Sequence, residues 1–198
     1  GGGARKEPQD QVVEDNKGSK ITAGAKAQPA NYLATLANMA MGGLTRDDIV
    51  PIEVPDTTAG MRAFMEGRAD VTAIAPAGGN IAEADSQIGV RFLDTKDDPA
   101  RLKLAQSIEP GGKLVSFKAG STVGITKDIK MWAFSKQVIT STLLSDDVAY
   151  TLTKIWWDNY QKLEPLHAQF KGWTPEIYVS KNATLPYHSG AIAFYKEK

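Results

Sequence analysis

Residues that could carry out covalent chemistry are scarce in this chain. Cysteine is absent, which excludes disulfides, thiolate zinc sites and cysteine nucleophiles. The two histidines, His167 and His188, stand apart, without metal-ligand spacing and without a partnering serine or acid motif. The run Gly78-Gly79-Asn80 matches neither a dinucleotide-binding glycine motif nor a P-loop with its lysine. We therefore expect no enzyme activity, no cofactor and no metal, and we interpret each histidine as a structural hydrogen-bonding residue.

Residues that could bind a small molecule are more numerous, and they follow short strand-like runs. They are small or polar and mostly uncharged, which suits a shallow cradle of backbone N–H, amide and hydroxyl groups. The candidate ligand-binding residues are Lys26, Gln28, Asn31, Thr57, Thr58, Gly79 and Asn80. Lys26 could neutralise a carboxylate. The alternative interpretation is that Asp56 only caps a helix, that the turn at Gly79 only reverses the chain, and that the open helix start after Gln28 binds water.

The stretch from residue 20 to residue 80 must position these candidates. Strands are expected at residues 20–23, 50–54 and 70–75, and helices begin at Gln28-Pro29 and at Asp56. Strands alternating with helices of this length predict an α/β fold with a mainly parallel sheet and flanking helices. In such sheets, ligands bind outside the carboxyl ends of the strands, which is where the candidate residues lie.

The rest of the chain predicts a division into three parts. Residues 1–18 are polar and aperiodic, which indicates a flexible or linker segment. Residues 19–94 would form the α/β ligand-binding lobe, and residues 95–198 a return segment with C-terminal helices of a second lobe. Within the last part, residues 132–142 suggest one or two strands, and Ser145 is the expected cap of a long helix. Because Trp156 and Trp157 are adjacent, they cannot both face one core.

Composition limits the partners. The formal net charge is zero, so nothing points to nucleic acid or to an anionic membrane surface. No apolar run approaches the roughly 18 residues that span a bilayer. The first residues lack the apolar core of a signal peptide. We expect that a signal peptide was removed; the alternatives are that it was never present or was not included.

The C-terminal sequence carries the most specific resemblance. Residues 185–197, LPYHSGAIAFYKE, resemble the C-terminal signature of the TAXI-type (TRAP-associated extracytoplasmic immunogenic protein) solute receptors of TRAP transporters. Ser189 stands where that signature usually has proline. Residues 44–49, 61–71 and 143–154 resemble further elements of the family in the same order, so that the similarity covers about residues 17–198.

This resemblance implies a periplasmic binding protein type II fold with an apparently incomplete N-terminal lobe. It implies an extracytoplasmic, periplasmic receptor that delivers a small organic carboxylate or amino acid, such as a glutamate-like solute, to membrane-embedded TRAP transporter subunits. Two alternatives stay open: a receptor-like sensor or interaction module that uses the same lobe without transport, and, less favoured, an α/β enzyme. The lack of a nucleophile, metal cluster or phosphate loop argues against the enzyme.

Overall fold

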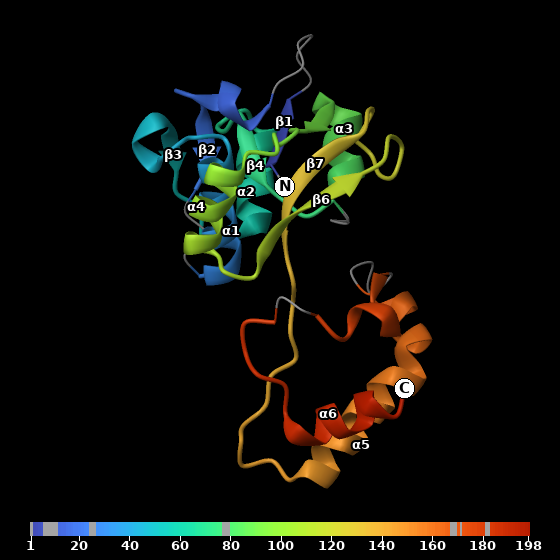
Figure 1. Cartoon of the computed structure of the whole chain (residues 1–198). Helices are drawn as coiled ribbons and strands as arrows, with labels where there is room; N and C mark the ends of the chain where they lie inside the picture. The colour runs from blue at the N-terminus through green and yellow to red at the C-terminus, as the bar shows by residue number, and fades with distance from the viewer. Residues whose placement is uncertain are drawn as a thin grey trace. The chain divides into compact units, whose positions relative to one another are not determined.

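A computed structural model describes residues 2–5, 12–23, 27–76, 80–166, 170, 172–180 and 183–198. The chain forms two compact units, Gly1–Ser135 and Lys136–Lys198, which we describe one at a time (Figure 1). The division into lobes at residues 94 and 95, expected from the sequence, stays a prediction.

The first unit is built on a five-stranded sheet. Its strands are β1 (Gly2–Arg5), β2 (Lys20–Thr22), β3 (Val50–Ile52), β4 (Val71–Ala73) and β5 (Val90–Phe92). They lie in the order β3-β2-β4-β1-β5. Strand β2 pairs in parallel with β3 and β4, whereas β1 pairs antiparallel with both β4 and β5. Four strands therefore run in one direction with β1 inserted against them, which confirms the predicted α/β class with a mainly parallel sheet.

Two described parts of the N-terminal segment have regular structure. The expectation of a flexible residue 1–18 segment is wrong for β1, which is an inner strand of the sheet, and for the 3-10 helix η1 (Val13–Asn16), which buries Val13. Backbone hydrogen bonds to β4 and β5 hold β1 in place, so it needs no alternation of apolar side chains.

Helices cover both faces of this sheet because successive strand residues point to opposite sides. The helices are α1 (Pro29–Met41), α2 (Thr57–Met65), α3 (Ile81–Ile88) and α4 (Pro99–Ile108). On one face, Ile21 and Val71 share an apolar cluster with Met39 of α1. A second cluster contains Phe92 of β5 and Phe64 of α2. Helices α1 and α4 lie beside each other (Figure 1).

A two-stranded antiparallel ribbon completes the first unit. It consists of β6 (Gly112–Phe117) and β7 (Ile129–Phe134). The expectation of strand structure at residues 132–142 is wrong beyond Phe134, since residues 135–141 have no regular structure. Phe134 pairs with Gly112, the first residue of β6, so the partner strand extends no further. In β7, the buried Trp132 donates a hydrogen bond from Nε1 to Glu109 Oε2 at 2.5 Å. Burial raises the pKa of Glu109, and the bond from Trp132 opposes that rise.

Replacing Glu109 with glutamine is expected to change how stability depends on pH. The carboxyl of Glu109 has a pKa above its ordinary value of 4.5 in the folded chain, so the folded state holds its proton to higher pH than the unfolded state. The contribution to stability is therefore complete below the unfolded pKa and is lost as pH rises through the folded pKa. Glutamine stays neutral and still accepts from Trp132, so E109Q should gain in stability relative to the native chain as pH rises. Urea unfolding at a series of pH values measures this, and a difference that is constant with pH would contradict it.

The second unit is a helical pair with aromatic contacts. It contains α5 (Asp146–Leu163) and α6 (Ser189–Lys196), joined by a segment with the 3-10 helices η3 (Glu164–Leu166) and η5 (Pro175–Ile177). The two adjacent tryptophans have different partners, as predicted: the ring of Trp156 lies 5.7 Å from that of Trp173, and Trp157 lies 5.7 Å from Phe194.

The ends of these helices test two further expectations. His188 caps α6, since its Nδ1 accepts a hydrogen bond from Gly190 N at 3.2 Å, which confirms its structural role. His167 lies outside the described residues. Ser145 occupies the N-cap position of α5, but its side chain makes no capping hydrogen bond there.

Candidate functional site

The candidate site lies along the carboxyl ends of three neighbouring parallel strands. Because β3, β2 and β4 are adjacent and run in the same direction, the segments that follow them leave the same edge of the sheet. Gln28 lies in the segment after β2, Asp56 in the segment after β3, and Asn80 in the segment after β4. We call this the carboxyl edge.

Gln28 links two of these segments. It occupies the N-cap position of α1 but makes no side-chain capping bond, as expected for a poor capping residue. Its Oε1 instead accepts hydrogen bonds from Asn31 Nδ2 at 2.9 Å and from the backbone N of Thr57 at 3.3 Å. Three of the predicted residues therefore meet at one oxygen atom, and the N-termini of α1 and α2 lie next to each other.

Close packing fixes the start of α2 against the sheet. Asp56 caps the helix as predicted, with Oδ1 accepting from Ala59 N at 2.8 Å. One turn later, a Cβ on Gly60 would lie only 3.2 Å from Thr72 Oγ1, so the helix backbone approaches the sheet closely. Beneath it, the buried hydroxyls of Thr22 and Thr72 are 2.9 Å apart and hydrogen-bonded. The half-buried Thr57 and the exposed Thr58 are thus held on a rigid support.

The other predicted residues are placed less fully. Asn80 is half-buried at the N-terminal end of α3, and its side chain makes no capping hydrogen bond. Lys26 and Gly79 lie outside the described residues. Of the seven candidates, the structure therefore brings together Gln28, Asn31 and Thr57, and places Thr58 directly after them.

Sequence reasoning missed a charged pair at this edge. Arg46 donates from Nη1 to Ala23 O at 2.9 Å, and its Nη2 pairs with the carboxylate of Glu53. Arg46 belongs to the 3-10 helix η2 (Arg46–Asp48), which precedes β3 rather than following it. Three strand residues extend only about 10 Å, so a long arginine side chain can run the length of β3 to its far end. The short length of β3 was the feature of the sequence that could have indicated these contacts of Arg46.

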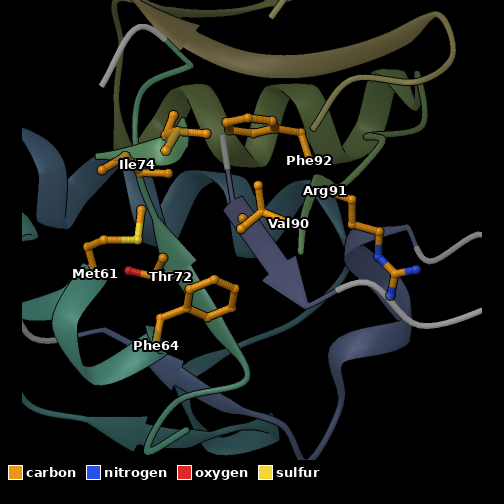
Figure 2. Close-up of a pocket in the computed structure, with 9 residues that line it drawn as sticks. Met61, Phe64, Thr72, Ile74, Val90, Arg91 and Phe92 are labelled. Carbon is orange, nitrogen blue, oxygen red and sulfur yellow. The ribbon is translucent and has the colours of Figure 1, made fainter. Parts of the chain in front are cut away.

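An apolar cavity elsewhere in the unit does not serve as a solute site. It lies between the sheet and helices α2 and α3, and Met61, Phe64, Ile74 and Phe92 are among the residues that line it. Figure 2 shows these side chains turned toward one another, with the side chain of Arg91 extending away from them. The cavity measures about 10 Å³, which is at most the space of one water molecule. It is a packing gap in the core.

The chemistry available at the carboxyl edge is hydrogen bonding. Across the described part of the chain, no group of three or more histidine, aspartate or glutamate residues is arranged to hold a metal ion. None of the described helices combines the length and the hydropathy needed to cross a membrane. Amide, hydroxyl and backbone donors at the start of two helices can bind a small polar or anionic molecule.

Comparison with known proteins identifies the family. The model of the NMT1-like family matches residues 4–198, and the chain belongs to that family. The match supports a periplasmic binding protein type II fold and does not single out the TAXI receptors. No curated protein sequence matches the chain significantly.

The solved structures that resemble the chain include two proteins named SsuA. One is the periplasmic aliphatic sulphonate binding protein SsuA from Escherichia coli, with 17% identity and a TM-score of 0.46 over 99% of this chain and 59% of that protein. The other is the alkanesulfonate-binding protein SsuA from Xanthomonas axonopodis pv. citri bound to MOPS, with 18% identity and a TM-score of 0.42 over 85% of this chain and 47% of that protein. The chain thus spans less than two thirds of the length of either protein.

Proposed function

We propose that this chain belongs to an extracytoplasmic receptor that binds a small organic carboxylate or amino acid and delivers it to a membrane transporter. The observation that carries the proposal is the carboxyl edge, where Gln28 joins the N-termini of α1 and α2. Ligands of open α/β sheets bind at such an edge. Membership in the NMT1-like family supports the proposal, because it supports the type of fold that closes on small solutes.

The chemistry of the edge favours a solute with an acid group. Helix N-termini present unpaired N–H groups and a partial positive charge, and both favour an anion. In this proposal Lys26 neutralises the carboxylate. The polar contacts come from Gln28, Asn31, Thr57, Thr58, Gly79 and Asn80. The resemblance of residues 185–197 to TAXI receptors supports TRAP transporter subunits as the membrane partner and a glutamate-like compound as the solute.

A thermal-shift screen tests the proposal directly. The panel contains L-glutamate, other amino acids, 2-oxoglutarate, succinate and ethanesulfonate, because sulfonate offers the same donors another anion geometry. A compound at 100 times its dissociation constant should stabilise the chain by about 2.7 kcal/mol. Folded protein that gains no stability from any compound would count against the receptor.

Replacing Gln28 with glutamate tests the charge of the solute. Glutamate keeps an Oε1 acceptor for Asn31 and Thr57 but adds a negative charge at the carboxyl edge. Two like charges about 5 Å apart at an effective dielectric constant of about 20 repel by about 3 kcal/mol before salt screening. Q28E should therefore weaken binding of an anion by tenfold or more in a calorimetric titration. The control is Q137E, the same change at an exposed residue of the second unit. Equal affinity of Q28E and the native chain would show that no anion binds at this edge.

A further inference from the structure

The connection between β6 and β7, residues 118–128, is a folded loop rather than an open turn. Backbone hydrogen bonds join Gly120 N to Ile125 O at 2.8 Å and Ile125 N to Thr122 O at 3.2 Å. At its base, the carboxylate of Asp128 accepts from Ala119 N at 3.0 Å and from Lys118 Nζ at 2.6 Å. Internal bonds of this number give the loop a defined shape, which allows it to position other groups.

The same loop is seated on the outer strand of the sheet. Phe92 N of β5 donates to Gly124 O at 2.9 Å. Gly124 has φ +83°, and a Cβ there would lie 3.3 Å from both Phe92 Cδ2 and Val90 Cγ2, so the contact is close. Ile125 is 3% exposed and belongs to the apolar cluster that contains Phe92. The loop is thus anchored to the unit that carries the carboxyl edge.

From this anchored position, Thr122 reaches the segment that follows β4. Its Oγ1 donates a hydrogen bond to Pro76 O at 3.1 Å, across 46 positions of sequence. Pro76 lies three residues after the end of β4, on the way to Asn80 and the start of α3. The hydroxyl therefore ties the carboxyl end of β4 to a rigid neighbour.

We propose that Thr122 is a positioning residue of the solute site, which holds Pro76, at the carboxyl end of β4, in the position that solute binding requires. The inference rests on the proposed function, because it adds a determinant to the same carboxyl edge. Thr122 acts through Pro76 and not by touching the solute. Loss of its hydroxyl leaves the fold intact but loosens the carboxyl end of β4, one of the three strand ends that form the carboxyl edge.

Three variants test this role. T122V replaces the donor hydroxyl with a methyl group of similar size, T122S keeps the hydroxyl, and S121A removes the exposed neighbouring hydroxyl as the matched control. In the free protein, amide exchange at Ile74, Ala75 and residues 80–84 should rise about fivefold in T122V, the factor that one net hydrogen bond supplies. The dissociation constant of whichever panel compound binds the native chain best should also rise about fivefold in T122V. T122S and S121A should match the native chain in both measurements.

Two results would overturn the inference. One is unchanged amide exchange in T122V, because the bond would then not hold the segment. The other is faster exchange with unchanged affinity, because Thr122 would then have a structural role alone. If the native chain binds no compound of the panel, the proposed function fails first, and this inference falls with it.

Discussion

Replacing Phe64 with alanine is expected to lower the free energy of unfolding of the first unit by about 3–5 kcal/mol. The side chain is 0% exposed and belongs to the apolar cluster that contains Phe92 and Met131. Removing the ring loses the favourable free energy of its transfer from water into the core, and it leaves a cavity that the neighbouring side chains fill only in part. Alanine would leave most of the space of the phenyl ring empty, beside a cavity that already measures about 10 Å³. Because whole domains have stabilities of about 5–15 kcal/mol, the loss is a large share.

Urea unfolding followed by far-UV circular dichroism measures the effect of F64A. The matched control is L104A, because Leu104 lies on α4 with 54% of its surface exposed, and its truncation should change stability by no more than about 0.5 kcal/mol. F64L keeps an apolar side chain in the core and should lose less than F64A. Similar losses in F64A and L104A would mean that Phe64 does not lie in the core. A loss of α2 would also reach the carboxyl edge, since Thr57 begins that helix.

The order of strands and helices could be predicted because local chemistry marks the ends of these elements. Asp56 and Asp98 cap helices, and Gly43 follows the end of α1 with φ +69°, each as its residue type favours. Even Pro51 fits, because β3 is an edge strand and can do without one ladder N–H. Strand β1 could not be predicted, since its sequence Gly-Gly-Ala-Arg has no side-chain pattern and long-range backbone bonds alone define it.

The candidate site shows the same division between local and distant information. Parallel strands must end at one edge, so the positions of Gln28 and Thr57 followed from the fold class. Their shared hydrogen bond did not, because it depends on which way a glutamine side chain turns in space. Arg46 and Thr122 were missed for a related reason: they reach the edge from segments that do not follow its strands.

Replacing Gly190 with alanine is expected to separate α6 from α5 in the second unit. A Cβ at this position would lie 2.1 Å from Asp146 O and 2.9 Å from Tyr150 N, and backbone atoms cannot rotate out of the way as a side chain can. The ring of Phe194, which is 1% exposed and packs 5.4 Å from Tyr150, depends on the same close approach. Overpacking in a core typically costs about 1–3 kcal/mol, and a contact with backbone lies at the upper end of that range or above it.

Hydrogen exchange of the amides of α5 reports this loss directly. G190A should raise the exchange rates by about a hundredfold, the factor that corresponds to about 3 kcal/mol at room temperature. The control is G172A, the same change in the same unit, where an added Cβ would meet no atom within 4 Å. Native exchange in G190A would show that the helices do not cross at Gly190. Rapid exchange in both variants would show that the unit tolerates no glycine replacement, and the contact at Gly190 would then have no special role. Only fast exchange confined to G190A means that this backbone contact holds the helical pair together.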